Sequence, residues 1–445
     1  MLRIRFTPFR SALIIFVVSF AVYSIPPIYD LVHKPFFTWA NGQDVASTSI
    51  LPITLLEHGD FYLDEYRDFY NQNWHSPYFV AEVNGRLVSR SPVSAAVIAI
   101  PFYGIPLGTG WLRNPGYEWL TFAWSAFFPA KFASAFFTAL AVVMLFFCAR
   151  ELTDLKTSAT IALLFGFGTS VWSTASQALW QQTPSILFQS IGIWFLLRGQ
   201  RKGALAVAPA ALFFSAATVS RTNDAIPAIL FTFYILIQYR AAFVRWVGWA
   251  ILPAVLVLVY NTIYNGSPLV FGYQDGVTQD ILAPQLEGLA GLLISPSRGL
   301  LIYSPFLILS FLSFGLIQKE QAKLFYQFCG LVFILFIVSL SMWRYWDGGW
   351  GFGTRMLTDA LPYACLLLIP AFQRLGHRAR FVVLATGVYA ALVQSFGLWD
   401  YGVRWHWHWD NWTYNVWDWV ENEPLFYLKT YIVMAGHYLN RFLHL

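Results

Sequence analysis

Long apolar runs recur along the whole chain and are separated by short polar loops. A run of about 20 apolar residues is the length that an α-helix needs to cross the hydrocarbon core of a bilayer. The runs lie at 11–29, 92–112, 119–149, 158–174, 180–197, 204–219, 225–238, 246–264, 299–317, 325–342, 358–372 and 381–398, with a short terminal segment at 431–443. We therefore expect an all-α integral membrane protein with about 11 to 13 transmembrane helices. No linker or internal repeat divides the chain, so residues 1–445 are expected to form one polytopic membrane domain.

The composition excludes a soluble globular protein. Charged residues make up only 11% of the chain and hydrophobic residues 57%, whereas an ordinary soluble domain has about 25% charged residues. The formal net charge is +5, but the Lys and Arg residues are scattered singly rather than gathered on one stripe, so we expect no nucleic-acid partner. The three cysteines, Cys148, Cys329 and Cys365, lie inside apolar runs and have no disulfide or metal-binding spacing.

The basic residues predict how the chain is threaded. Lys and Arg occur in several short loops, namely Arg150 with Lys156, 198–202, Arg240 with Arg245, Lys319 with Lys323, and 374–380. Because Lys and Arg resist translocation, we place these loops and the N-terminus on the cytoplasmic side. No small-residue cleavage site follows the first run, so we expect an uncleaved anchor. The two longest outward segments are then 30–91 and 399–430.

One parity problem follows from this threading. Two runs, 92–112 and 119–149, lie between the first outward segment and the inward loop at Arg150, so one of them is not a simple crossing. Either 92–112, which contains Pro101 and Pro106, lies along the interface or re-enters, or 119–149 crosses twice. Lys131 lies inside the second run, where it is either a functional intramembrane residue or part of a loop between two crossings.

Acidic residues are densest in the first outward segment. Asp64 and Glu65 belong to one acidic stretch, and Asp44 lies earlier, directly before a sequence that would start a short interfacial helix. A carboxylate at the membrane surface can act as a general base if it lies within hydrogen-bond reach of an acceptor hydroxyl. Asp44 is the first candidate for this role, and Asp64, Glu65 and Asp347 are secondary candidates. The alternative for the secondary acids is a solvated loop.

Arginines adjoin the outward ends of several runs. Arg221, Arg298 and Arg355 each follow this pattern, and Arg90 lies in the first outward segment. An arginine at this depth either anchors lipid headgroups or binds a phosphate. The glycine-rich turn at 348–353 favours an anion site, because glycines let the backbone approach a ligand closely.

Aromatic and amide side chains add candidates for substrate binding. The residues at 404–410 alternate, so as a strand they would place Arg404, His406, His408 and Asp410 on one face and three Trp on the other. The Trp face is expected in the interfacial aromatic belt, and the polar face toward a cavity, with a metal site as the alternative. Gln181 beside Trp180 either contacts substrate or satisfies hydrogen bonds between helices. Trp350 lies within the glycine-rich turn.

The order and spacing of six short pieces carry a resemblance to a known family. These pieces are Asn41-Gly-Gln-Asp44, 51–65 with Glu57-His-Gly-Asp60, Leu87-Val-Ser-Arg-Ser-Pro-Val93, Ala178-Leu-Trp-Gln-Gln-Thr-Pro184, Ser295-Pro-Ser-Arg-Gly-Leu300 and Trp350-Gly-Phe-Gly-Thr-Arg355. Together they resemble the GT-C superfamily of polytopic glycosyltransferases, and within it the bacterial proteins similar to the dolichyl-phosphate-mannose protein mannosyltransferase family. The resemblance covers nearly the whole chain.

The resemblance implies a function and a site. It implies a sugar donor linked to polyprenyl phosphate, a lipid-linked glycan, cell-envelope polymer or protein as acceptor, and transfer with inversion. It maps the general base to Asp44 and implies a bacterial inner membrane with the active site on its extracytoplasmic face. Arg298, Arg355, Arg221 and Arg90 would neutralise the leaving phosphate, and Gln181, Trp350, His406 and His408 would contact substrate. Gln43 precedes Asp44 where members of the family often have paired acids, so a divalent cation remains an open possibility.

Two other classes of membrane protein remain as alternatives. A transporter or lipid flippase would also have many spans, but the runs between 158 and 343 carry almost no ionisable residues at mid-membrane, and no inverted repeat is apparent. An O-acyltransferase or phosphotransferase would use a centre built on histidine or metal, for which the candidates are His58, His75, His406 and His408. The side chains that face the substrate cavity would distinguish these classes.

Overall fold

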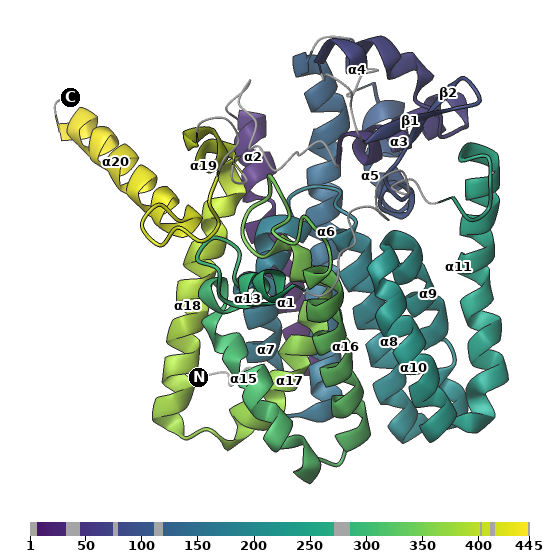
Figure 1. Cartoon of the computed structure of the whole chain (residues 1–445), viewed down its shortest axis with the longest axis vertical. Helices are drawn as coiled ribbons and strands as arrows, with labels where there is room; N and C mark the ends of the chain where they lie inside the picture. Colours follow the sequence, from purple (N-terminus) through teal and green to yellow (C-terminus); the bar gives the residue numbers. More distant parts are fainter. Residues whose placement is uncertain are drawn as a thin grey trace.

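The computed structural model of the chain is almost entirely helical (Figure 1). It describes residues 7–32, 45–73, 79–110, 119–270, 285–400, 403–409 and 414–443. Within these ranges the strands are β1 (Val80–Val83) and β2 (Arg86–Ser89), which pair antiparallel. Asn84 and Gly85 join them with positive φ angles of 52° and 79°, the backbone that a two-residue Asn-Gly hairpin requires.

Six helical segments within the described ranges are long and apolar enough to cross a membrane. They are Pro8–Val32, which comprises α1 (Pro8–Tyr23) and α2 (Ile25–Val32); Ser125–Leu152 of α6 (Trp119–Leu152); Arg240–Tyr264, which contains α11 (Phe243–Tyr264); α16 (Lys323–Ser341); Arg355–Arg374, which contains α17 (Leu361–Arg374); and most of α18 (His377–Asp400). The expected all-α membrane protein with several crossings is therefore confirmed.

Further helices occupy the other apolar runs. They are α5 (Ser94–Gly108), α7 (Leu155–Phe167), α8 (Gln182–Lys202), α9 (Ala210–Ser220), α10 (Ala225–Gln238), α14 (Leu300–Tyr303) and α15 (Ile308–Leu312), with α13 (Leu286–Ile294) before α14. The run at 299–317 is broken between α14 and α15, where Pro305 starts a short 3₁₀ segment because proline cannot continue the hydrogen bonds of a helix. The exact number of crossings stays a prediction.

The run at 119–149 forms one continuous helix, so of the two alternatives for the parity problem, two crossings at 119–149 is wrong. Lys131 lies inside this helix, 1% exposed, and its Nζ atom is 3.3 Å from Asp30 Oδ2 of α2. The pair places both charges together in the interior, which removes the cost of burying either one alone. Helix α5, with Pro101 and Pro106, packs against α3 (Ala46–His58) and α6 and lies with the β-hairpin at one end of the molecule (Figure 1).

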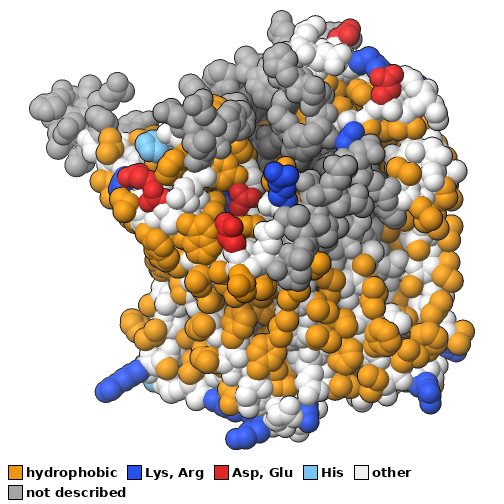
Figure 2. All heavy atoms as spheres, in the orientation of Figure 1, with side chains coloured by type: hydrophobic (Ala, Val, Ile, Leu, Met, Phe, Trp, Pro, Cys, Tyr) orange, Lys and Arg blue, Asp and Glu red, His pale blue; other side chains and the backbone are white. Residues whose placement is uncertain are grey.

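The two ends of the bundle differ in charge. Figure 2 shows a broad belt of hydrophobic side chains, with Lys and Arg but no visible Asp or Glu along the lower rim, and with Asp and Glu beside further Lys and Arg toward the upper part. Asp154 caps α7 at the lower end by accepting hydrogen bonds from the backbone of Lys156 and Thr157. In the belt, side chains such as Val244 (81% exposed) face outward, as expected where lipid replaces water.

The upper end brings together segments that are far apart in the sequence. These are the turn at 295–299, the loop at 348–353, the 3₁₀ helix η10 (Arg355–Ala360), α19 (Val403–His408) and the start of α20 (Glu423–Leu443), which extends away from the bundle (Figure 1). The strand expected at 404–410 is wrong, because 403–408 is helical. Residues two apart on a helix are about 200° apart, so His406 is buried while the His408 side chain is 49% exposed.

Candidate functional site

Arg298 is the centre of a buried polar network at the upper end of the bundle. It is 2% exposed and follows a tight turn in which Gly299 N donates to Ser295 O at 2.7 Å. A Cβ on Gly299 would lie 2.5 Å from that oxygen, so the turn requires glycine. The Arg298 guanidinium donates to Ser297 O at 2.7 Å and to Gly349 O at 3.2 Å, which ties the turn to the glycine loop at 348–353.

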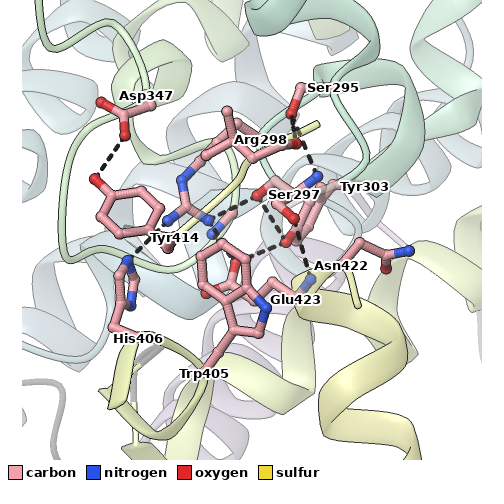
Figure 3. A network of polar contacts seen from close by, with 12 residues as sticks. Ser295, Ser297, Arg298, Tyr303, Asp347, Trp405, His406, Tyr414, Asn422 and Glu423 are labelled. Carbon is pink, nitrogen blue, oxygen red and sulfur yellow. Dashed lines mark hydrogen bonds and ion pairs between the residues drawn. The ribbon is translucent and has the colours of Figure 1, made fainter. Parts of the chain in front are cut away.

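Glu423 supplies the negative charge of this network (Figure 3). It is the first residue of α20 and is fully buried. One of its oxygens, Oε2, accepts from Arg298 Nη1 at 2.8 Å, from Tyr303 OH at 2.7 Å and from Gly353 N at 2.9 Å. The ion pair is charge-balanced and surrounded by hydrogen-bond donors, which is what a buried pair needs to offset the desolvation of both ions. Glu423 therefore fixes the start of α20 to the loop.

His406 contributes an aromatic surface beside Arg298. Its Nε2 atom is 3.2 Å from Arg298 Nη2, and a guanidinium can only donate, so this hydrogen-bond pattern assigns a neutral imidazole with its proton on Nδ1. The ring stacks on Trp350 with 5.2 Å between centroids. His408 points elsewhere, with its Nε2 4.0 Å from Glu421 Oε2, and no three His, Cys, Asp or Glu residues of the described ranges could hold a metal ion together.

The glycine loop wraps closely around Arg355. Gly348, Gly349 and Gly353 have φ angles of 77°, 58° and 57°, which other residues rarely adopt. A Cβ on Gly351 would lie 2.4 Å from Arg355 Cδ. The loop therefore fixes where the Arg355 side chain runs.

Trp180 connects Arg355 to the start of α8. The Arg355 guanidinium carbon lies 5.0 Å from the centre of the Trp180 ring, within the range of a cation–π contact. Gln181 follows Trp180 directly, so it adjoins this contact. On the other side of Trp180, Leu179 O accepts a hydrogen bond from Thr48 Oγ1 at 3.1 Å. The start of α3 is thus bonded to the residue that precedes Trp180, although the two segments are far apart in the sequence.

Asp347 is held on the outer side of the loop. Tyr414 OH donates to Asp347 Oδ2 at 2.7 Å, and Gly349 N donates to Oδ1 at 3.3 Å. Burial, the negative charge of Asp347 and this hydrogen bond together raise the pKa of Tyr414. The tyrosine therefore keeps its proton and donates it to the carboxylate, which positions Asp347 as an acceptor in a structural contact.

Arg221 does not join the Arg298 network. It forms an ion pair with Asp359 of η10, four residues after Arg355. Asp359 and Asp224 both lie against the hydroxyl of Ser185, at 2.8 Å and 2.5 Å. Arg221 and Arg355 are thus connected through one short helix rather than placed around one cavity.

The remaining candidates belong to the first outward segment. Asp64 accepts hydrogen bonds from the Leu87 backbone at 2.6 Å and from Arg67 at 3.1 Å, and it pairs with Arg86. Burial alone would raise the pKa of Asp64, but these hydrogen bonds outweigh it and the pKa is lowered. Glu65 is exposed.

Arg90 is tied to the β-hairpin rather than to the Arg298 network, since its Nε donates to Val80 O at 3.1 Å. Asp44 and His75 lie outside the described residues, and so does Asp410.

Sequence reasoning missed Glu423, Tyr303, Asp359 and Ser185. One signal could have found an acid like Glu423: a buried arginine requires a buried anion, and Glu423 adjoins a terminal apolar segment.

No protein-family model matches the chain, and no curated protein sequence matches it. The helices and the polar network at one end of the bundle define a multi-pass α-helical membrane protein. Its activity therefore has to be argued from its own residues.

Proposed function

We propose that this protein is a membrane glycosyltransferase of the GT-C type. It transfers a sugar from a polyprenyl-phosphate donor to a lipid-linked glycan, a cell-envelope polymer or a protein. One observation carries the proposal. The start of α3, which directly follows the segment with Asp44, is bonded through Thr48 to Leu179, next to the Trp180 ring that contacts Arg355. Thr48 is four residues after the candidate base Asp44 in the sequence, and Leu179 directly precedes the tryptophan that contacts the candidate phosphate ligand Arg355.

The two arginines of the glycine loop have different roles in this proposal. Arg298 is neutralised by Glu423, so we assign it to holding the loop and the aromatic pair of His406 and Trp350. Arg355 is assigned to the donor phosphate, where its charge would stabilise the negative charge that develops on the leaving group. A polyprenyl phosphate lies at headgroup depth, which suits an arginine at the polar end of a transmembrane bundle.

Two of the three secondary candidate acids are committed to other contacts, which supports Asp44 as the base. A general base needs an oxygen that can face the acceptor hydroxyl. Asp64 is committed to Arg67, Arg86 and a backbone donor, and Asp347 to Tyr414. In the proposed reaction, Asp44 takes the proton of the acceptor hydroxyl while its oxygen attacks the anomeric carbon. The bond from that carbon to the phosphate oxygen breaks, polyprenyl phosphate leaves, and the configuration inverts.

The proposed orientation follows the charge of the two ends. The rim rich in Lys and Arg would face the cytoplasm by the positive-inside rule, and the Arg298–Arg355 end would face outward. For a bacterial chain this places the reaction on the extracytoplasmic face of the inner membrane.

Transfer from a labelled polyprenyl-phosphate sugar tests the proposal directly. The protein is reconstituted in liposomes with extracts of native membrane as the acceptor source, and loss of label from the donor is measured. Asp44→Asn is expected to reduce the rate on the order of 10²-fold or more, as for the loss of a general base. Arg355→Gln is expected to reduce it by a similar factor, since one charge-stabilising donor is removed. Arg344→Gln is the matched control, because Arg344 is exposed and lies just before the same loop.

A full rate in Asp44→Asn would place the base elsewhere, and a full rate in both variants would contradict the proposed site. One observation favours the alternative of a transporter or flippase: charged groups, in the pairs Lys131–Asp30 and Arg221–Asp359, are buried in the described bundle. That alternative predicts movement of the lipid across the bilayer with no chemical change in it. The same liposomes distinguish the two functions, because only transfer releases polyprenyl phosphate.

A further inference from the structure

A second buried polar cluster lies where α8, η10 and the connection between α9 and α10 meet. Its centre is the Ser185 hydroxyl, which is 2.5 Å from Asp224 Oδ2, 2.8 Å from Asp359 Oδ1 and 2.9 Å from Gln189 Nε2. These four side chains are all at most 1% exposed. Arg221 pairs with Asp359 at the edge of the cluster.

If both aspartates are ionised, this cluster has too few hydrogen atoms for all of its short contacts to be hydrogen bonds. A serine hydroxyl has one hydrogen and accepts through its lone pairs. The Gln189 amide donates to Ser185, and the single hydroxyl hydrogen serves one of the two carboxylates. At the other carboxylate, the Ser185 oxygen and the carboxylate oxygen then face each other with no hydrogen between them. It becomes a hydrogen bond only when that carboxyl group carries a proton and donates it to Ser185.

The charges lead to the same conclusion. Arg221 contributes one positive charge and is paired with Asp359, so an ionised Asp224 would leave the buried cluster with a net charge of one negative unit. The other titratable group that faces the pair is the Tyr363 phenol on α17, which carries no positive charge in either state. Asp224 Oδ1 is buried and has no hydrogen-bond partner among the described residues. A buried carboxylate oxygen without a donor is costly, whereas a neutral carboxyl group is much less so.

We propose that Asp224 and Asp359 together bind one proton near neutral pH, and that Asp224 carries it as a neutral carboxylic acid. The ligand of this site is a proton, shared through the Ser185 hydroxyl. Asp359 stays ionised because Arg221 is its partner.

The site has a consequence for Arg355. Asp359 and Arg355 belong to the same short helix, η10, and Thr358 between them bonds to Arg355 O at 2.7 Å and to Ser170 at 2.8 Å. Loss of the proton would place two negative carboxylates on one serine oxygen, and their repulsion would push Asp359 of η10 away from Asp224 in the connection between α9 and α10. Asp224 is therefore a positioning residue for Arg355. This last step rests on the proposed function, whereas the bound proton does not.

Infrared spectroscopy of the full chain in lipid tests the proton without any substrate. A protonated carboxylic acid has its own carbonyl stretching band, which an ionised carboxylate lacks. Near neutral pH, the difference spectrum between wild type and Asp224→Asn is expected to contain this band. Asp154→Asn is the matched control: Asp154 accepts two backbone hydrogen bonds at the lower end, so its removal is expected to leave the band unchanged.

Identical spectra for wild type and Asp224→Asn would overturn the proposal. If Asp224→Asn does not fold, Ser185→Ala replaces it, because the carboxyl group then loses its acceptor and the band shifts; an unshifted band overturns the proposal equally. Spectra are also recorded with sodium replaced by a bulky organic cation. A band that arises only without sodium would mean that a metal ion, not a proton, neutralises the pair. Absence of glycosyl transfer would leave the infrared result untouched.

Discussion

Two buried arginines at the polar end of the bundle are neutralised in different ways. Arg298 faces one carboxylate, Glu423, whose Oε2 also accepts from Tyr303 and Gly353. Arg221 faces a pair of carboxylates, because Asp359 shares Ser185 with Asp224. The first cluster is balanced by its own side chains, whereas the second balances only when it binds a proton.

The number of carboxylates around each arginine determines how many charge states the cluster has. An ion pair of one cation and one carboxylate has one stable charge state, so it fixes geometry. A cluster with a spare carboxylate has two charge states separated by one proton, so it can respond to pH. The glycine loop at 348–353 and η10 connect the two clusters, since Gly349 O accepts from Arg298 and Asp359 lies at the far end of η10. Arg355 lies between them.

The largest expected effect is the loss of the balanced pair. Within the described ranges, Glu423 is the carboxylate that pairs with Arg298, so Glu423→Gln leaves a buried charge, which typically costs about 3–5 kcal/mol. The temperature of thermal unfolding in detergent is expected to fall strongly, and limited proteolysis is expected to release α20. Glu421→Gln is the matched control, because its pair with Lys429 is exposed and worth about 0–1 kcal/mol. Equal stability of the two variants would contradict the structural role of Glu423.

The next effect concerns the loop between the clusters. Gly351→Ala would place a Cβ 2.4 Å from Arg355 Cδ, so the Arg355 side chain has to move. A misplaced catalytic group can cost on the order of 10² in rate, so the transfer assay is expected to lose most of its rate while the fold persists. Gly248→Ala on α11 is the control, since nothing lies within 4 Å of its added Cβ. A full rate in Gly351→Ala would mean that Arg355 does not act where the loop now holds it.

A smaller effect is expected in the unbalanced cluster. In Asp359→Asn the spare carboxylate Asp224 can ionise and pair with Arg221, so the loss of stability is expected to be about 1–2 kcal/mol, less than for Glu423→Gln. Asp224→Asn is expected to be close to wild type, because the carboxamide donates to Ser185 as a carboxylic acid would. Thermal unfolding of the two variants side by side measures this asymmetry. A greater loss for Asp224→Asn would place the ionised carboxylate on Asp224 instead.

The sequence predicts the helices well and their rotation poorly. Apolar runs of sufficient length form helices because a bilayer leaves few other ways to satisfy the backbone. In such a bundle both the lipid-facing and the buried sides are apolar, so the pattern does not separate them. On α18, for example, Val388 is exposed and Ala390 is fully buried, yet both are apolar. The rotation of each helix is decided by packing that the local sequence does not contain.

The candidate site was predictable in its residue types and not in its pairings. Arg298, Arg355, Trp350 and His406 do meet at one glycine loop, whereas Arg221 and Arg90, which were predicted as phosphate ligands with the two loop arginines, contact other segments. Arg298 and Glu423 are 125 residues apart, and no local pattern links them. The alternation at 404–410 favoured a strand, but a helix there buries Trp405 against Arg298, and this long-range contact outweighs the local pattern.

The smallest expected effect comes from an ion-pair network near the surface, in which Arg67 and Arg86 share Asp64 and also pair with Glu82 and Asp60, respectively. Asp64 pairs with Arg67 and Arg86 near the surface, and its pKa is lowered in the folded protein because hydrogen bonds favour the charged form over the effect of burial. A lowered pKa stabilises the fold above the unfolded value of about 4, and this contribution is lost as the pH falls through the folded pKa. Because the pairs are partly exposed, the loss is expected to be at most about 1 kcal/mol.

Acid titration of unfolding measures this contribution. Wild type is expected to lose stability in the outer segment below about pH 4, the ordinary range of an aspartate. Asp64→Asn is expected to be less stable than wild type at neutral pH. Its stability is expected to lack the part of the acid dependence that comes from Asp64. Asp68→Asn is the control, since Asp68 is exposed on the neighbouring helix α4 (Arg67–Asn73) and its change is expected to leave the acid profile in place. If Asp64→Asn kept the whole acid dependence, the carboxylate that titrates would be another one, and the pairs of Asp64 with the two arginines would contribute no measurable stability.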